Sequence, residues 1–192
     1  MATFTESALR ARARRETTNF SKTASAVLTE KVTKQEDLKT FDVFLSHAYD
    51  DRELLTGVVL SIEDLGYSVY IDWREDPKLD RSQVTSATAA VLRERMRNSR
   101  CLFYSVTPSS KDSAWMKWEL GWKDGHNNRT AILPIEKDGS DSWSGQQFLG
   151  LYPYVSGGKI EGSLKNALWI HRSSSCYIQF DAWLNGKEPI QR

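Results

Sequence analysis

The feature that most constrains the fold of this chain is a regular alternation of short apolar segments with longer segments of helical spacing. The apolar segments are rich in β-branched and aromatic residues, which is typical of buried strands. They lie at 41–46 (FDVFLS), 67–72, 100–106 and 130–136. Because strands that alternate with helices build βαβ units, the pattern predicts an α/β fold whose central parallel sheet carries helices on both faces.

The segments between these strands place apolar residues at the three- and four-residue spacing of amphipathic helices. We expect helices over 52–65, 84–97 and about 112–124. Gly125 is expected to end the last of them, because glycine favours helix C-termini. Ligands of such sheets bind at the carboxyl ends of the strands, beside the point where the strand order reverses. The residues that follow each strand are therefore the first place to look for a site.

The N-terminal segment has a different character from the rest of the chain. Residues 1–39 are polar with few apolar positions, and we expect one or two helical segments there, which pack on the domain or on another subunit. The arginines between Arg10 and Arg15 are interpreted as a solvated helix face. The sequence thus predicts an N-terminal helical extension followed by a domain over residues 40–186.

The residues after 137 follow the pattern less regularly. The segment 149–155 is expected to form a fifth strand or a tight proline turn. Segments 167–171 and 176–180 predict a C-terminal hairpin, and 181–186 predicts one closing helical turn.

Composition excludes several classes of function. The 192 residues carry a formal net charge of +1, which gives no general reason to expect nucleic acid or an anionic membrane as a partner. No apolar run reaches the ~18–20 residues that span a bilayer. The N-terminus also lacks the apolar region of a secretory signal. We therefore expect a cytoplasmic protein.

The cysteines and histidines indicate no metal centre. Cys101 and Cys176 both lie in predicted strands and are interpreted as reduced, buried small residues. Two cysteines are too few for a Cys-based zinc site, and His47, His126 and His171 are too scattered for metal-ligand spacing. The sequence predicts neither a metal nor a cofactor.

The segment 115–122 (WMKWELGW) is the most informative part of the chain. Trp115 and Glu119 are four residues apart, so they lie on one helix face, and Trp118 and Trp122 form a second such pair. Large indole rings beside a glutamate can remove water from its carboxylate. The spacing alone nevertheless favours a structural interpretation, in which the tryptophans belong to the core and Glu119 is a solvated helix residue.

Two loops carry weaker signals. Residues 44–51 (FLSHAYDD) lead into a helix whose N-terminal amides suit a phosphate, although an ordinary strand–helix turn is the simpler interpretation. The loop 72–82 (DWREDPKLDRS) suits a diphosphate clamp or an assembly surface as well as it suits a solvent-exposed connection. The chain has no P-loop, no GxGxxG and no GxSxG elbow, which disfavours both the usual dinucleotide-binding mode and a Ser–His–Asp triad.

Three segments, in this order along the chain, resemble the Toll/interleukin-1 receptor (TIR) domain family. Residues 41–51 (FDVFLSHAYDD) resemble its first strand and the loop that follows, and 63–73 (EDLGYSVYIDW) resemble its second strand and the start of its BB loop. The segment 114–121 (AWMKWELG) is similar to the glutamate-bearing helix of bacterial TIR enzymes. The resemblance covers residues 40–185 and implies a flavodoxin-like TIR fold.

The resemblance also implies an enzyme that cleaves NAD. Bacterial TIR domains of this kind are NAD glycohydrolases or ADP-ribosyl cyclases, and they include the signal-producing subunits of Thoeris anti-phage defence. The catalytic glutamate of the family corresponds to Glu119, and NAD is then a substrate rather than a cofactor. Trp115 is expected to stack on a ring of the dinucleotide or to exclude water. The other substrate contacts of the family correspond to Phe44, Ser46, His47, Asp72, Trp73 and Arg74.

Partners are implied in the same way. TIR enzymes often act as assemblies, so we expect a homo-oligomer formed through the BB loop and a downstream effector that senses the product. The resemblance leaves the product open among linear, cyclic and conjugated ADP-ribose. Two alternatives also stay open, namely a non-catalytic TIR module that signals by oligomerisation and a related enzyme that acts on another nucleotide. The first 39 residues and the C-terminal segments depart from the family pattern.

Overall fold

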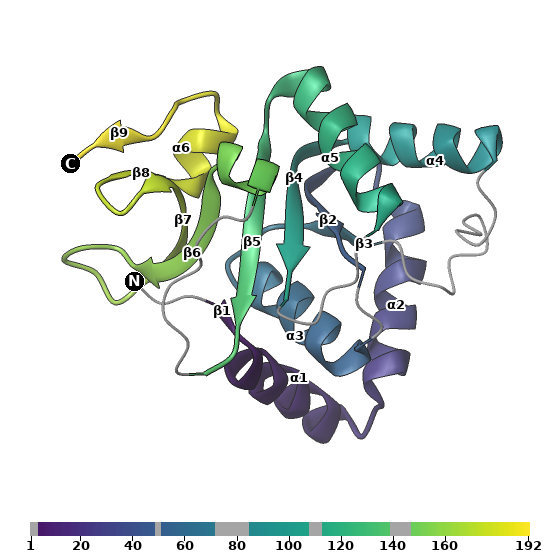
Figure 1. Ribbon diagram of the computed structural model, residues 1–192. Helices are drawn as coiled ribbons and strands as arrows, with labels where there is room; N and C mark the ends of the chain where they lie inside the picture. Colours follow the sequence, from purple (N-terminus) through teal and green to yellow (C-terminus); the bar gives the residue numbers. More distant parts are fainter. Residues whose placement is uncertain (1–3, 49–50, 72–84, 108–112, 139–146) are drawn as a thin grey trace.

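The computed structural model describes residues 4–48, 51–71, 85–107, 113–138 and 147–192. Within these ranges, nine strands form one sheet with helices on both faces (Figure 1). The strand order is β3-β2-β4-β5-β6-β7-β8-β9, and β1 pairs separately with β5. No helix in the described part of the chain is long and apolar enough to cross a membrane.

The strands of the first half pair in parallel, as the alternating pattern predicts. β2 lies between β3 and β4, so the order of the strands reverses beside β2. The order β3-β2-β4-β5-β6 is the flavodoxin-like order, which confirms the predicted fold class. The strands are β2 (Phe41–Ser46), β3 (Val69–Ile71), β4 (Ser99–Val106) and β5 (Thr130–Glu136).

β3 is shorter than expected at its N-terminal end. The sequence predicts a strand from residue 67, whereas β3 begins at Val69. The ring of Tyr67 instead packs edge-on against Phe180, with ring centroids 4.8 Å apart, and its hydroxyl donates a hydrogen bond to Asp181 over 2.8 Å.

Each helix between these strands begins at a side chain that accepts a hydrogen bond from its first turn, which is a stabilising N-cap. Asp51 caps α3 (Arg52–Glu63), Thr85 caps α4 (Ser86–Arg97) and Ser113 caps α5 (Ala114–Asn127). The prediction that α5 ends at Gly125 is wrong. The helix continues to Asn127 and ends where Asn128 takes a left-handed conformation with φ 51°, which asparagine tolerates better than most residues.

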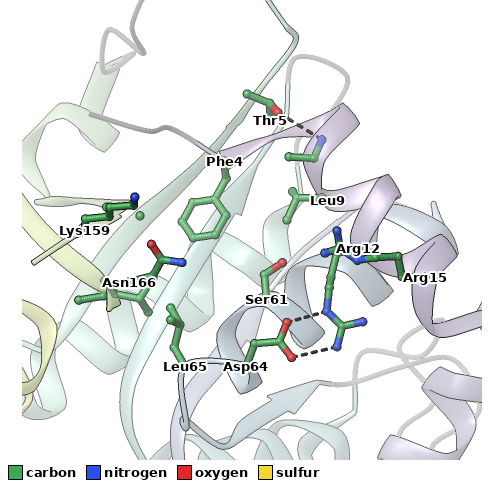
Figure 2. Close-up of a pocket in the computed structure, with 15 residues that line it drawn as sticks. Phe4, Thr5, Leu9, Arg12, Arg15, Ser61, Asp64, Leu65, Lys159 and Asn166 are labelled. Atoms are coloured by element: carbon green, nitrogen blue, oxygen red, sulfur yellow. Dashed lines mark hydrogen bonds and ion pairs between the residues drawn. The ribbon is translucent and has the colours of Figure 1, made fainter. Parts of the chain in front are cut away.

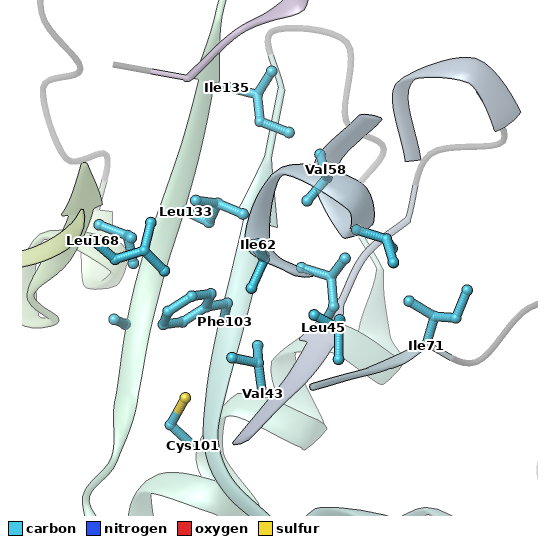
Figure 3. Close-up of a cluster of buried hydrophobic side chains, with 14 of the residues drawn as sticks. Val43, Leu45, Val58, Ile62, Ile71, Cys101, Phe103, Leu133, Ile135 and Leu168 are labelled. Carbon is cyan, nitrogen blue, oxygen red and sulfur yellow. The ribbon is translucent and has the colours of Figure 1, made fainter. Parts of the chain in front are cut away.

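The core lies in two layers, one on each face of the sheet. Successive residues of a strand point to opposite faces, so Val43 and Leu45 of β2 face α3, whereas Phe44 faces α4 and α5. Figure 3 shows the first layer, where Val58 and Ile62 of α3 pack on these strand residues. Helices α1, α2 and α6 contribute to the α3 face.

The N-terminal extension forms two helices, α1 (Glu6–Phe20) and α2 (Ala24–Asp37), that pack against α3. A two-residue strand, β1 (Phe4–Thr5), precedes them and pairs in parallel with Ile135 and Glu136 of β5. The predicted helices are confirmed, and β1 was not predicted.

The interpretation of the four α1 arginines as a solvated face is wrong for the first two, which are partly buried in ion pairs, whereas the last two are exposed. Arg10 contacts Asp51 over 2.6 Å and Glu53 over 3.3 Å, at the start of α3. Arg12 contacts Asp64 over 2.6 Å, at the other end of the same helix. The acidic residues of α3 therefore match the basic residues of α1 along the whole contact between the two helices.

The C-terminal part continues the sheet with antiparallel strands. A short 3-10 helix, η1 (Gln147–Leu151), leads into β6 (Tyr154–Lys159), so the segment around residue 153 contains both the turn and the start of the fifth strand. The predicted hairpin and closing turn are confirmed. They are β7 (Asn166–Ser173), β8 (Cys176–Gln179) and α6 (Phe180–Leu184), and the chain ends with β9 (Ile190–Gln191).

One cysteine differs from its predicted environment. Cys101 is fully buried in β4, and burial raises the pKa of its thiol above the usual range. Cys176 is only partly buried, and its strand β8 is the last but one in the sheet order.

Candidate active site

The structure brings two of the predicted site residues into direct contact. Ser46 is the last residue of β2 and lies on the same face of the sheet as Phe44, beneath α5. Its hydroxyl Oγ donates a hydrogen bond to Oε2 of Glu119 over 2.5 Å. Both side chains are fully buried. The interpretation of Glu119 as a solvated helix residue is therefore wrong.

The position of this pair in the sheet is the one at which ligands of α/β proteins bind. The strand order reverses between β2 and β4, and ligands of such sheets bind beside the carboxyl ends of the strands at a reversal of this kind. Ser46 ends β2 at that edge, and α5 brings Glu119 to it. A buried carboxylate requires hydrogen-bond donors, and the Ser46 hydroxyl supplies one while fixing the direction in which Oε2 points.

Helix α5 is held in place by a buried face. Met116, Glu119, Leu120 and Lys123 are its buried residues, at the spacing of one helix face. Met116 and Leu120 belong to the apolar layer beneath α4 and α5, so their burial fixes the depth at which Glu119 enters the molecule.

Lys123 is a part of this arrangement that sequence reasoning missed. Its Nζ donates to the main-chain carbonyl of Met96 over 2.8 Å and to that of Ser99 over 2.5 Å. These contacts join α5 to the end of α4 and the start of β4, and burial lowers the pKa of Lys123 to about 8. The only available signal was its position four residues after Glu119, on the same helix face.

The tryptophans of α5 have different environments. Trp118 lies beneath the guanidinium of Arg93 at 5.4 Å, and Trp122 lies beneath that of Arg97 at 5.8 Å. Both arginines come from α4, so this predicted Trp118–Trp122 face forms cation–π contacts between the two helices. Trp115 is half-buried and meets Trp118 edge to face, with ring centroids 5.4 Å apart. It lies one turn closer to the start of α5 than Glu119 does.

The other predicted contacts lie around the end of β2 or outside the described residues. Phe44 is fully buried and stacks on Tyr70 with centroids 5.1 Å apart, so its side chain joins β2 to β3 within the core. His47 is almost fully buried, and its Nδ1 lies 3.3 Å from the carbonyl oxygen of Leu45. Substrate contacts at these two positions, at Ser46 and at Trp115 stay predictions. Substrate contacts at Asp72, Trp73 and Arg74 also stay predictions, because these residues lie outside the described ranges.

The arrangement has a defined chemical capacity. A carboxylate whose direction is fixed, in a site from which water is excluded, can accept hydrogen bonds from hydroxyl groups and can stabilise a developing positive charge. Over the described ranges, no three His, Cys, Asp or Glu side chains are grouped so as to hold a metal ion. Glu119 and Ser46 are both fully buried, so neither side chain is exposed to solvent in this state.

Comparison with known proteins places this site in a family context. The model of the TIR domain matches residues 43–157, a range that contains Ser46 and Glu119. The chain is 44% identical to a protein of Bacillus cereus (strain MSX-D12) named probable 3' cyclic ADP-D-ribose synthase ThsB'. This match extends over 169 residues, which are 86% of this chain and 88% of the relative. The chain is also 33% identical to a protein of Cytobacillus dafuensis named putative cyclic ADP-D-ribose synthase TIR2. That match extends over 85 residues, which are 44% of this chain and 22% of the relative.

Proposed function

The chain belongs to the TIR domain family, and on this premise we propose that it cleaves the bond between nicotinamide and ribose in NAD and releases an ADP-ribose-derived signal. The observation that carries the proposal is the buried carboxylate of Glu119, held by Ser46 at the reversal of the strand order. The names of the two relatives, both cyclic ADP-D-ribose synthases, support a cyclic product. As a bacterial TIR enzyme of this kind, the protein would act in anti-phage defence, with a separate effector sensing the signal.

The proposed chemistry requires one carboxylate and no general acid. Nicotinamide is bound to the ribose as a cation and leaves as a neutral molecule, so it needs no proton. The transition state has the character of an oxocarbenium ion. The ionised Glu119 would accept hydrogen bonds from the ribose hydroxyls and stabilise the positive charge that develops on the ring.

The fate of the ribosyl cation decides the product. Capture by water gives linear ADP-ribose, whereas capture by a nucleophile within the same dinucleotide gives a cyclic product. Trp115 is half-buried one helical turn from Glu119, and in this proposal it stacks on the dinucleotide and keeps water from the cation. Its replacement by alanine is then expected to raise the share of linear product.

The burial of Glu119 implies that the described state is closed to substrate. We propose that self-association of the chain, expected through the BB loop, opens the crevice and admits NAD. Binding energy released on assembly would then stabilise a state that the single molecule populates only weakly.

The proposal is tested by incubating the purified protein with NAD, both dilute and at concentrations that drive self-association, and identifying the products by mass spectrometry. Wild type is expected to release nicotinamide and form an ADP-ribose derivative, whereas Glu119→Gln is expected to be inactive with an unchanged circular dichroism spectrum. Glu94→Gln, at an exposed position of α4, is the matched control and should keep full activity. Nicotinamide release by Glu119→Gln at the wild-type rate would refute the assignment. If wild type releases none in any assembly state while protection from phage persists in Glu119→Gln, the protein is a non-catalytic module.

A further inference from the structure

A pocket of about 490 Å³ lies on the face of the sheet opposite to Glu119. It is bordered by β1 and α1, by the end of α3, and by the ends of β6 and β7 that are joined by the hairpin turn (Figure 2). Its volume is within the range of ~300–1,000 Å³ that is typical of small-molecule sites. The sheet itself separates this pocket from the candidate active site, so the two are distinct.

The pocket exists because the sheet opens between β5 and β6. These two strands share a single register pair, Ile132 with Tyr154, whereas β6 pairs with β7 over six residues. Beyond that point β1 pairs with the end of β5. The side chain of Phe4 projects from β1 into the opening, between Leu9 and Ser61 on one side and Lys159 and Asn166 on the other (Figure 2).

The lining combines an apolar surface with a cationic rim. Its apolar members come from β1, α1, the turn after α3 and β7, and its rim carries three cations and one carboxylate. The carboxylate, Asp64, accepts two hydrogen bonds from Arg12, over 2.6 and 2.9 Å, and Arg12 also contacts Glu16 over 3.0 Å, so its charge is compensated. The apolar members are Phe4, Ala8, Leu9, Leu65, Ala167 and Leu168.

Two cations of the rim remain for a ligand. Arg15 and Lys159 are both exposed, and in the described part of the chain neither takes part in an ion pair. They lie on opposite sides of the opening (Figure 2). The charge that the lining leaves uncompensated is therefore positive, next to an apolar surface.

We propose that this pocket binds a small organic anion, with its apolar or aromatic part against Phe4 and Leu168 and its acidic group at Lys159 or Arg15. The apolar surface supplies the driving force of burial, and the cations select an anion over a neutral molecule of the same shape. The bound ligand bridges α1 to the β6–β7 hairpin. It takes no part in the chemistry at Glu119, because the sheet lies between the two sites.

The probe for the test is 8-anilinonaphthalene-1-sulfonate, a small aromatic anion that fluoresces when it enters an apolar site. Wild type and Glu119→Gln are both expected to bind one equivalent saturably, which separates this inference from the proposed enzymatic activity. Ala8→Trp, which fills the pocket from α1, is expected to raise the Kd about tenfold or more. Ala11→Trp, at an exposed position of α1 outside the lining, is the matched control and should leave the Kd unchanged.

The role of the cations in binding is tested by reversing the charge of exposed lysines. Lys159→Glu is expected to raise the Kd about tenfold and to weaken its dependence on salt, whereas Lys165→Glu should have little effect. Competition then identifies the ligand class: displacement by AMP but not adenosine indicates a nucleotide, and displacement by octanoate but not octanol indicates an aliphatic acid. Absence of saturable binding, or an equal Kd in wild type, Ala8→Trp and Lys159→Glu, would overturn the proposal.

Discussion

The contact between Ser46 and Glu119 assigns these two residues different tasks. Glu119 is the group that would meet the ribose, whereas Ser46 acts through Glu119 by holding its carboxylate with a 2.5 Å hydrogen bond. Removing the hydroxyl leaves a buried carboxylate with one donor fewer, and hydrogen bonds to charged groups contribute about 1.5–3 kcal/mol. We therefore propose that Ser46 is a positioning residue, whose loss should affect the rate more than substrate binding.

We expect Ser46→Ala to lower kcat for NAD cleavage by about 10- to 100-fold while KM changes little, because the hydrogen bond serves the transition state. Ser46→Thr retains the hydroxyl and should recover part of the loss. Steady-state kinetics on all three proteins provide the measurement. A rise in KM with kcat unchanged would mean instead that Ser46 binds the substrate directly.

Lys123 makes stability depend on pH in the alkaline range. Its pKa in the folded protein is lowered to about 8 by burial, whereas in the unfolded chain it returns to the ordinary value near 10.5. Between these values the unfolded chain binds more protons, so the contribution of Lys123 to the free energy of unfolding increases as the pH rises from 8 to above 10.

The comparison with Lys123→Met isolates this contribution, because the other titrating groups are shared. From pH 7.5 to pH 10, the free energy of unfolding of wild type should rise relative to that of Lys123→Met by roughly 1–3 kcal/mol. Urea unfolding at both pH values measures the difference. A constant difference between the two proteins would show that Lys123 keeps an ordinary pKa when folded.

At the scale of elements, α1 crosses α3 at a point that admits no side chain. A Cβ added to Gly57 of α3 would lie 2.1 Å from the main-chain oxygen of Leu9, which is far closer than two such atoms can approach. Gly57→Ala is therefore expected to force the helices apart and to lower the free energy of unfolding by roughly 1–3 kcal/mol or more.

Gly125→Ala is the control for this substitution. Gly125 lies within α5 with open space around its Cα, so alanine there should stabilise the helix by about 0.5–1 kcal/mol. Thermal or urea unfolding of both variants tests the pair. Equal effects would indicate that α1 does not contact α3 in solution as it does here.

The elements that could be predicted from the sequence are those whose own residues carry a strong pattern. β2, β4 and β5 are mainly apolar and rich in β-branched or aromatic residues, and they appear at nearly the expected residues. β1 and β9 have two residues each, which is too short for any periodicity, so only their pairing partners define them. The end of α5 was misplaced because both Gly125 and Asn128 suit a helix terminus, and packing decides between them.

The candidate site shows the same limit. The spacing predicts that Glu119 lies on the same helix face as Trp115. Only the fold determines that Glu119 is buried and contacts Ser46 at the end of β2. Lys123 was overlooked because a lysine on a charged helix usually faces water. Its partners are main-chain carbonyls of Met96 and Ser99, which have no signature in the sequence.

For the whole molecule, the helices of the first 39 residues complete one layer of the core. Leu9, Leu28 and Val32 of these helices belong to the same apolar cluster as the buried residues of α3, so removing the helices exposes the α3 face to water. The division of the chain into an extension and a domain from residue 40 stays a prediction, which a deletion can test. The buried residues are Leu9, Ala13, Val27, Leu28 and Val32.

We expect the chain without residues 1–39 to be poorly soluble and to have a Tm lower by roughly 10 °C or more, because this apolar burial is lost. Removing residues 187–192 instead deletes only β9 and the exposed residues around it, and it should change the Tm little. Differential scanning calorimetry of the full chain and the two shortened chains measures these changes in Tm. An unchanged Tm after the N-terminal deletion would mean that the extension unfolds independently of the rest.

The strand at the C-terminal border of the sheet limits how copies of this protein can associate there. β9 has two residues, so this border offers only a few main-chain groups to a neighbouring strand. Copies that joined here by extending the sheet would form a polymer that is hard to take apart, and the short border discourages it. At this border, an assembly would rest on side-chain contacts, which dissociate more readily than a continuous sheet.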